Sequence, residues 1–193
     1  MWLVDGKSLD RHERGMDLKA QTAADLLKLH AGVIEELRSR GVVRTGNNPI
    51  GDYTEWLVCK HLGLVIQPNS RASYDGIDSR GIKYQIKGRR VANPNGYAQL
   101  GVIRNLEANG FDYLIAVVFN QDYTLRFAAK ITHAAVSEIA TYRSHVNGHV
   151  PIIRETIFEL SGVLDITDML SGPTQDPVPP ARLTPSNSES SES

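Results

Sequence analysis

Residues 73–90 read SYDGIDSRGIKYQIKGRR and contain two short runs of strand-like residues, separated by a turn that ends in glycine. In the second run, Ile82, Tyr84 and Ile86 alternate with polar residues, which is the period of a half-buried strand. Residues 79–81, SRG, suit a three-residue loop, because glycine adopts the left-handed conformation that its last position requires. This stretch therefore predicts a β-hairpin with one apolar and one polar face.

The length of this loop decides which carboxylate joins the polar face of the hairpin. A three-residue loop places Asp75 directly opposite Gln85, with Lys87 as a diagonal neighbour on the same face. A two-residue loop would shift the register by one position and bring Asp78 to that face instead. We favour the first register, because the second would force Arg80 into a positive φ that non-glycine residues avoid. Asp75, Gln85 and Lys87 are therefore predicted to converge, and Asp78 is the alternative carboxylate.

A further carboxylate is predicted on the helix that precedes the hairpin. Residues 48–63 read NPIGDYTEWLVCKHLG, in which Asn48 can cap the helix, Pro49 takes its first position and Gly63 ends it. The neighbours of Glu55 at one-turn spacing are all small or apolar: Gly51, Val58, Cys59 and Leu62. Because an uncompensated buried carboxylate is costly, Glu55 must reach solvent at the edge of this stripe or meet a cation, and a metal ion shared with Asp75 would serve.

The remaining elements indicate an α/β protein built around one mixed sheet. The spacing of apolar residues predicts an amphipathic helix over residues 22–41, which begins after Thr22 and ends at Gly41. Beyond the hairpin, two more helices are predicted over about 99–109 and over 132–143. The predicted strands are a buried one at 62–68 and two that pair with each other at 111–119 and 123–131, and residues 150–170 form a final edge of the domain.

Composition points to a folded protein in a reducing compartment. The chain has 193 residues, of which 41% are hydrophobic and 22% charged, close to the averages of soluble globular proteins. No apolar run approaches the ~18 residues of a membrane span, and the N-terminus turns polar too soon for a signal peptide. Cys59 is the only cysteine, which excludes an intramolecular disulfide and a zinc finger. We expect a cytoplasmic protein that does not associate with membranes.

Charge is distributed unevenly along the chain. The net charge of -1 argues against a general nucleic-acid coat protein, which would carry a large basic excess. Residues 71–90, however, hold two acidic residues and six basic ones: Arg71, Arg80, Lys83, Lys87, Arg89 and Arg90. A strand rich in such residues is typical either of a solvated sheet edge or of a phosphate-binding surface. Residues 171–193 are rich in Pro, Ser and acidic groups and are predicted to be disordered.

Three pieces of this pattern together resemble a known family. The helix "GDYTEWL" with Glu55, the strand "YDG" with Asp75 and the strand "QIK" with Gln85 and Lys87 are similar to the PD-(D/E)xK superfamily, the restriction-endonuclease-like nucleases. The similarity spans residues 49–90, and the elements predicted up to about residue 143 agree with the common core of that family. Gln85 replaces the usual Asp or Glu, which removes one negative charge from the metal site, and Tyr74 stands where the motif has Pro.

The resemblance implies a domain organisation. A restriction-endonuclease-like core, with a central mixed β-sheet flanked by helices, would occupy residues 47–170. Residues 1–46 would form an N-terminal helical extension of this core, and residues 171–193 the disordered tail.

The resemblance also implies a metal centre. Asp75 would be the main ligand of Mg²⁺ or Mn²⁺, Gln85 and the backbone carbonyl of Ile86 would add oxygens, and Glu55 would bind directly or through water. Lys87 would orient or activate the attacking water or stabilise the pentacovalent phosphate. The phosphate backbone would be held by the remaining basic residues of the hairpin region: Lys83, Arg89, Arg90 and Arg71.

The function implied by this family is metal-dependent hydrolysis of phosphodiester bonds. We expect DNA rather than RNA as the substrate, and a small prokaryotic restriction-like or defence endonuclease as the kind of enzyme. Because one active site cuts one strand, cleavage of a duplex predicts a homodimer, and the chain could also act within a larger complex. Gln85 keeps open a second hypothesis, a catalytically inactive relative that binds nucleic acid or serves as a scaffold subunit.

Overall fold

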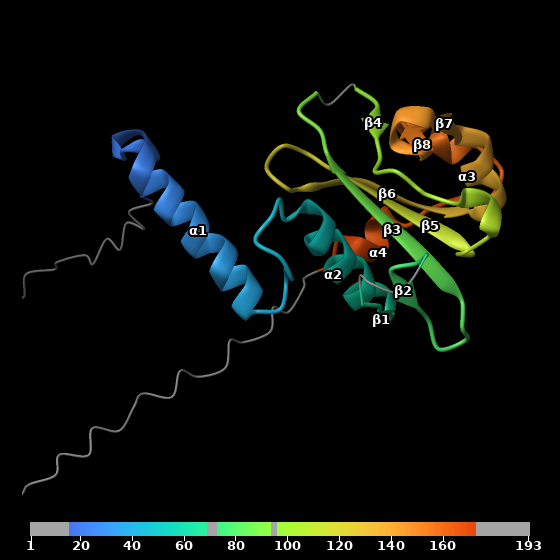
Figure 1. The fold of residues 1–193 in the computed structure, drawn as a ribbon, viewed down its shortest axis with the longest axis horizontal. Coiled ribbons are helices and arrows are strands. Elements are labelled where there is room, and N and C mark those ends of the chain that lie inside the picture. Colours follow the sequence, from blue (N-terminus) through green and yellow to red (C-terminus); the bar gives the residue numbers. More distant parts are fainter. Residues whose placement is uncertain (1–15, 69–72, 94–95, 173–193) are drawn as a thin grey trace, which may run out of the picture.

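A mixed six-stranded sheet forms the centre of the computed structural model, which describes residues 16–68, 73–93 and 96–172 (Figure 1). Its strands, in spatial order, are β1 (Val65–Ile66), β2 (Gly76–Ile77), β3 (Lys83–Arg90), β5 (Tyr113–Phe119), β6 (Leu125–Thr132) and β9 (Val163–Asp165). Only β3 and β5 run parallel, and the other neighbours are antiparallel. The predicted α/β class with a mixed central sheet flanked by helices is confirmed.

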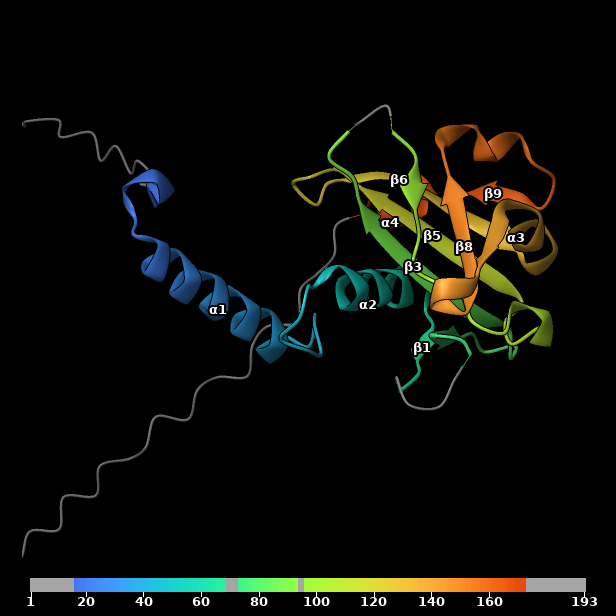
Figure 2. The same ribbon diagram turned by 45° about the horizontal axis from the view of Figure 1, so that its top comes forward.

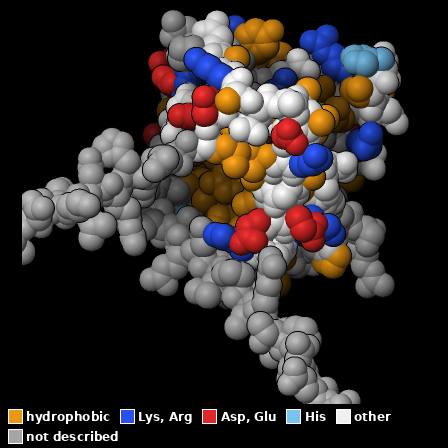
Figure 3. Space-filling model, turned by 90° about the vertical axis from the view of Figure 1, so that its left-hand side faces the viewer, with side chains coloured by type: hydrophobic (Ala, Val, Ile, Leu, Met, Phe, Trp, Pro, Cys, Tyr) orange, Lys and Arg blue, Asp and Glu red, His pale blue; other side chains and the backbone are white. Residues whose placement is uncertain are grey.

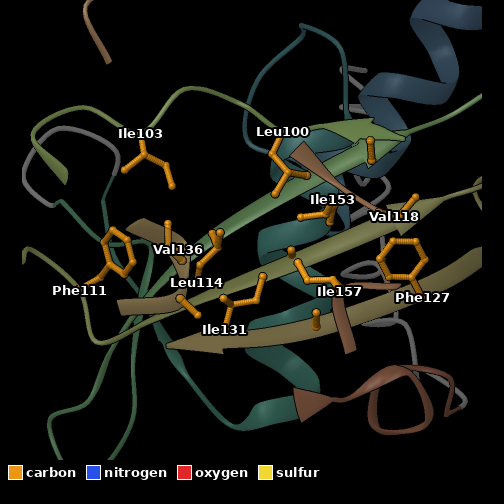
Figure 4. Packing of buried hydrophobic residues seen from close by; sticks show 14 of the residues in the cluster. Leu100, Ile103, Phe111, Leu114, Val118, Phe127, Ile131, Val136, Ile153 and Ile157 are labelled. Carbon is orange, nitrogen blue, oxygen red and sulfur yellow. The ribbon is translucent and has the colours of Figure 1, made fainter. Parts of the chain in front are cut away.

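Each face of this sheet is covered by its own layer (Figure 2). On one face lie α2 (Ile50–Leu62) and the short α4 (Thr167–Leu170). On the other lie α3 (His133–Ile139) and a small antiparallel sheet of β4 (Ala98–Gln99), β8 (Gly148–Ile153) and β7 (Ala140–Arg143). Strand alternation supplies an apolar cluster to both faces, and Figure 4 shows the second cluster, in which Leu114, Phe127 and Ile131 of the sheet pack with Val136 and Ile153.

The hairpin of β2 and β3 has the register that the sequence favours. Gly81 adopts a φ of +83°, and its N–H donates to the carbonyl of Asp78 at 3.0 Å, which closes the three-residue loop. Ile77 pairs with Lys83 and Gly76 with Tyr84. This register continues to Asp75 opposite Gln85, so the preferred prediction is confirmed and the two-residue loop is wrong.

Helix α2 approaches β3 very closely, because Gly88 has no side chain. A Cβ atom built at Gly88 would lie 1.9 Å from Oγ1 of Thr54 and 2.8 Å from its Cβ. Thr54 is fully buried, and its hydroxyl donates to the carbonyl of Ile50 at 2.5 Å. The contact between Thr54 and Gly88 therefore fixes where the next residue, Glu55, stands relative to the strand.

Helix α1 (Ala23–Ser39) projects away from the rest of the molecule (Figure 1). Thr22 caps it as predicted, accepting from the N–H of Asp25 at 3.2 Å, and Gly41 follows it with a φ of +69°. A short 3-10 turn, Leu18–Ala20, precedes it. Ile34 is the only buried residue of α1, so this helix gains little stabilisation from the core.

Three expectations about secondary structure were wrong. Residues 99–109 are not helical: β4 pairs with β8, Ile103 bridges to His149, and only the 3-10 turn Leu106–Ala108 is helical. The predicted helix over 132–143 ends at Ile139, because the following residues pair with β8 as strand β7. The strand predicted as buried over 62–68 is short, and both residues of β1 are exposed because β1 is the edge strand of the sheet.

The remaining elements complete the C-terminal part of the fold. They are the 3-10 turns Ser144–Val146 and Glu155–Glu159, and the expected edge over 150–170 consists of the end of β8, the second of these turns, β9 and α4. The predicted disordered tail spans residues 171–193. Of these, residues 173–193 lie outside the described residues. In the three described segments, no helix combines the length and the apolar composition needed to traverse a bilayer.

Candidate functional site

The site lies at the edge of β3 beyond the point where its pairing with β2 ends. Strand β2 ends at Gly76–Ile77, so beyond Tyr84 no strand of the described chain pairs with this edge of β3. The side chain of Asp75 takes the place of the missing strand, since its Oδ2 accepts from the N–H of Ile86 at 2.7 Å. In an extended strand the N–H and C=O of one residue face the same edge. The carbonyl of Ile86 therefore points toward the same open edge as the Asp75 carboxylate.

Asp75, Gln85 and Lys87 meet on the face of β3 that is turned away from α2. The amide of Gln85 is buried and donates to the same Oδ2 of Asp75. The stem of Lys87 lies beside Gly101, where a Cβ atom would be 3.4 Å from Cδ of the lysine. Burial raises the pKa of Asp75, although Lys87 and the bonds from Ile86 and Gln85 oppose the rise. The convergence predicted from the hairpin register is confirmed.

Glu55 reaches this cluster from α2, around the open edge of the sheet. Its side chain is 16% exposed. Burial raises the pKa of Glu55 to about 7, the negative charge of Asp75 adds to the rise, and the positive charges of Arg44 and Lys87 oppose it. Arg44 bonds Glu55 directly, whereas the charges of Asp75 and Lys87 act on it through space. The two carboxylates and Lys87 that were singled out separately in the sequence thus form one electrostatic cluster.

Arg44 is the member of the cluster that the sequence analysis missed. It lies between α1 and α2, where its guanidinium bonds Glu55, approaches Asp52 at 3.4 Å and donates to the carbonyl of Gln67 at 3.4 Å. The N–H of Gln67 donates to the backbone carbonyl of Asp75 at 2.9 Å, which closes a ring of contacts around the edge. The sequence predicted that Glu55 either reaches solvent or meets a cation such as a metal ion, and in this structure Arg44 is the cation that bonds it.

Asp52 holds Arg44 in place from the first turn of α2. Its Oδ2 accepts from the N–H groups of Arg44 and Thr45, both at 2.9 Å, and from the Thr45 hydroxyl at 3.0 Å. Partial burial acts to raise the pKa of Asp52, but these hydrogen bonds outweigh it and lower the pKa. Asp52 is therefore negatively charged and anchors the segment between α1 and α2, whereas Glu55 has a pKa near neutral pH.

The other predicted residues lie in different surroundings. Lys83 and Arg89 are exposed on β3, and the Lys83 ammonium lies 5.4 Å from the ring of Tyr74. Arg90 lies at the end of the strand, 4.6 Å from the ring of Tyr123. Asp78 belongs to the turn, where its carboxylate accepts from the N–H groups of Arg80 and Ile82 at 2.9 Å each. Asp78 therefore has a structural role in the loop, and Arg71 lies outside the described residues.

Oxygen atoms dominate the donors that face the open edge. Glu55, Asp75, the amide oxygen of Gln85 and the carbonyl of Ile86 are the types of ligand that Mg²⁺ and Mn²⁺ favour. Within the described segments, no group of three or more His, Cys, Asp or Glu side chains is arranged to hold a metal ion. Any ion at this edge would therefore need the amide or backbone oxygens in addition to the two carboxylates.

Comparisons with known proteins add no family to this picture. A scan against protein-family models finds no match, and a search of curated proteins finds no significant match.

Proposed function

We propose that this chain is a metal-dependent nuclease that hydrolyses phosphodiester bonds of DNA, of the restriction-endonuclease-like kind. The observation that carries the proposal is the meeting of Glu55, Asp75, Gln85 and Lys87 at the open edge of β3. These residues come from a helix, a strand end and the facing strand of the hairpin, in the order that the resemblance to the PD-(D/E)xK superfamily implies. The helix expected after the hairpin is absent, so the resemblance is strongest over residues 49–90.

The donor set fits a hard divalent cation. Burial raises the pKa of both Glu55 and Asp75, which means that each carboxylate lacks enough positive charge to offset its loss of water. A cation shared by the two would supply that charge. Mg²⁺ or Mn²⁺ would be held by Asp75 and Glu55, with the oxygens of Gln85 and Ile86 completing the protein's share of the ligands.

The residues divide the chemistry between them. A bound divalent ion would supply stabilisation of the charge that develops on the phosphate and a lower pKa for a water molecule. The positive charge of Lys87 acts on Asp75 through space, and from this position the ammonium would orient the attacking water or stabilise the pentacovalent phosphate. In this hydrolysis, water would add to phosphorus and release a proton, one P–O ester bond would break, and the departing oxygen would take up a proton. Lys83, Arg89 and Arg90 extend the positive charge along β3 for the flanking phosphates.

A homodimer is part of this proposal when the substrate is duplex DNA. One edge of one β3 strand offers one site, which cuts one strand, so symmetric cleavage of both strands needs two copies. The same chain could instead work as one subunit of a larger assembly. Sedimentation of the protein with and without duplex DNA distinguishes a monomer from a dimer.

A cleavage assay tests the proposal. Supercoiled plasmid, linear duplex and single-stranded DNA are incubated with Mg²⁺, Mn²⁺ or EDTA. Nicking or cutting should require the metal, and Asp75→Ala and Lys87→Ala should each lower the rate at least about a hundredfold, as expected for loss of one group that stabilises the transition state. Asp78→Ala, in the same hairpin, and Lys28→Ala, on exposed α1, are the matched controls and should retain activity. Intact substrates under every condition, or equal activity in all variants, would refute the nuclease.

One observation favours a second candidate, a catalytically inactive relative that binds nucleic acid as a scaffold. The Gln85 amide donates to Asp75 and the Arg44 guanidinium bonds Glu55, so each carboxylate already has a hydrogen-bond partner within the protein. Gln85→Glu separates the two candidates. It adds the missing negative charge to the site, so an active enzyme should change its rate or its metal preference. An inactive scaffold should gain no cleavage, and it should retain salt-dependent DNA binding.

A further inference from the structure

A large apolar cleft opens between the projecting helix α1 and the body of the protein. Its volume is about 750 Å³, within the range of ligand pockets in general. One wall comes from the C-terminal half of α1, with Val33, Ile34 and Leu37, and the other from the region of Pro49 and Tyr53 at the start of α2. Figure 3 shows hydrophobic side chains gathered in a hollow on the side of the molecule from which α1 projects.

The floor of the cleft carries a cationic and aromatic pair. The guanidinium of Arg90 lies 4.6 Å from the centre of the Tyr123 ring, and both residues line the cavity. Tyr53 lies beside them, 6.2 Å from Tyr123 in an edge-to-face arrangement, and its ring also contacts Phe119 at 5.6 Å. Arginine planes and tyrosine rings are the surfaces on which unpaired nucleobases stack in single-strand-binding proteins.

Tyr123 is held in an unusual conformation for an aromatic residue. Its φ is +67°, in the left-handed region that favours glycine and asparagine. It lies in the turn between β5 and β6, where its N–H donates to the carbonyl of Asn120 at 3.1 Å. An asparagine would suit this backbone better than a tyrosine does. The turn itself gives no reason for a tyrosine at position 123, so we look for the role of Tyr123 in its aromatic ring.

The cleft lies along β3 from the proposed catalytic edge. Arg90 follows Lys87 by three residues, which corresponds to about 10 Å along an extended strand. Lys87 and Arg89 project from one face of β3 and Arg90 from the other, so the strand carries positive charge from the edge cluster to the floor of the cleft. A DNA strand that places a phosphate near Lys87 would bring a neighbouring nucleotide to Arg90.

We propose that this cleft binds one unpaired base of a DNA strand, stacked on the pair formed by Arg90 and Tyr123, so that the protein selects single-stranded or frayed DNA over a fully paired duplex. The proposal rests on the proposed function for the identity of the ligand. The charge of Arg90 matches a phosphate, the rings match a base, and an apolar cavity excludes the paired partner strand. Asn47 and Asn48 also line the cleft, and their amide groups would be available to base edges.

Fluorescence anisotropy tests the cleft without any cleavage. A fluorescein-labelled 12-nucleotide thymidine oligomer and a blunt 12-base-pair duplex are titrated with the full chain in EDTA at low salt. The wild type should bind the single strand at least about fivefold more tightly than the duplex. Tyr123→Asn, which keeps the turn, should weaken single-strand binding about tenfold, within the range for loss of one base-stacking contact, and should leave duplex binding nearly unchanged. Arg90→Gln should weaken single-strand binding by at least the same factor and duplex binding less, because it also removes a positive charge near the flanking phosphates.

Two control variants make the same types of substitution at residues outside the cleft. Tyr142→Asn removes a tyrosine of β7 that is more exposed than Tyr123 and lies outside the cleft, and Arg154→Gln removes an arginine that also lies over a tyrosine ring, 5.6 Å from that of Tyr97. Both should bind like the wild type. Circular dichroism confirms that all four variants are folded before any binding is compared.

The binding results judge the cleft separately from catalysis. Selective single-strand binding that falls in Tyr123→Asn and Arg90→Gln supports the inference even when the wild type cuts no DNA. Equal affinity for the two DNAs, or unaltered binding in both variants while cleavage is normal, overturns it. A shift of the monomer–dimer equilibrium in the two variants, with DNA binding unchanged, would assign the cleft to a second copy of the chain and would also overturn it.

Discussion

Replacing Glu55 by glutamine should stabilise the metal-free protein at neutral and alkaline pH. Glu55 is largely buried near Asp75, and the bond from Arg44 does not offset the loss of water, so its pKa in the folded protein is about 7 against an ordinary value of 4.5. A carboxyl group with a raised pKa binds its proton more tightly in the folded state than in the unfolded state. Ionisation of Glu55 therefore costs folding free energy.

The sign and size of the effect follow from these two pKa values. Below pH 4.5 the group is protonated in both states and contributes nothing. Between pH 4.5 and about 7 the unfolded chain ionises first, so the free energy of unfolding falls as the pH rises, and above pH 7 the full penalty is present. The difference between the two pKa values corresponds to about 3 kcal/mol, at 1.36 kcal/mol for each pKa unit. Glutamine cannot ionise, and it keeps an amide oxygen for Arg44.

Urea denaturation in EDTA at pH 4.5 and at pH 8 measures this difference. Glu55→Gln should match the wild type at pH 4.5 within about 0.5 kcal/mol and exceed it by up to about 3 kcal/mol at pH 8. Glu138→Gln, at an exposed position of α3, is the control and should change stability by less than about 0.5 kcal/mol at either pH. A variant that is less stable than the wild type at pH 8 would show that the pair with Arg44 outweighs burial, and the reasoning would be refuted.

Three further predictions concern the packing of α2 and the hairpin. Gly88→Ala should destabilise the protein by about 2–3 kcal/mol in urea denaturation, because its Cβ would overlap Thr54, and it should lower cleavage by displacing α2. Adding Thr54→Gly should recover part of the lost stability, and no recovery would contradict a direct clash. Asp78→Ala should cost about 1–2 kcal/mol through the lost turn bonds yet retain cleavage, so an inactive but folded variant would argue for Asp78 as the metal ligand. Gly81→Ala should cost about 1 kcal/mol because of its φ of +83°, and an unchanged midpoint of denaturation would contradict the loop geometry.

The local rules of turns and caps predicted the part of the fold that forms the site. The positive φ expected at Gly81 set the hairpin register, and that register alone brought Asp75 opposite Gln85. The cap at Thr22 was predicted correctly as well, because its hydroxyl bonds a free backbone N–H only three residues away. One local prediction was wrong: α2 begins at Ile50 with Pro49 as its N-cap and without a side-chain cap, one residue later than a cap at Asn48 implied.

Predictions that depend on distant pairing were less successful. Leu100, Ile103 and Leu106 recur at a three-residue spacing that resembles one face of a helix, and all three are indeed buried in one cluster. The chain reaches that cluster in an extended form instead, because β4 pairs with β8, about fifty residues later in the sequence. No feature of residues 99–109 indicates that they pair with β8. The sequence therefore predicted which of these residues are buried, but not that they are buried in an extended conformation.

Arg44 shows the same limit at the level of the site. The neighbours of Glu55 on its helix implied that a buried carboxylate needed a positive partner, and this inference was sound. The partner lies in the linker between two helices, in a segment whose sequence has no motif. Its position depends on Asp52, which accepts from the Arg44 backbone, and on the Gln67 carbonyl. A search for every basic residue within a dozen positions of Glu55 would have found it.

The open edge of β3 also bears on the solubility of the protein. A strand with unpaired backbone groups is a template on which another extended chain can add, and natural proteins guard such edges with charged side chains. Here Asp75 occupies the Ile86 N–H, and the exposed arginines Arg89 and Arg90 end the strand. The groups that we propose for DNA chemistry would therefore also protect this edge against intermolecular β-sheet growth. Variants that neutralise them, Asp75→Ala first among them, should form aggregates at lower protein concentration than the wild type does.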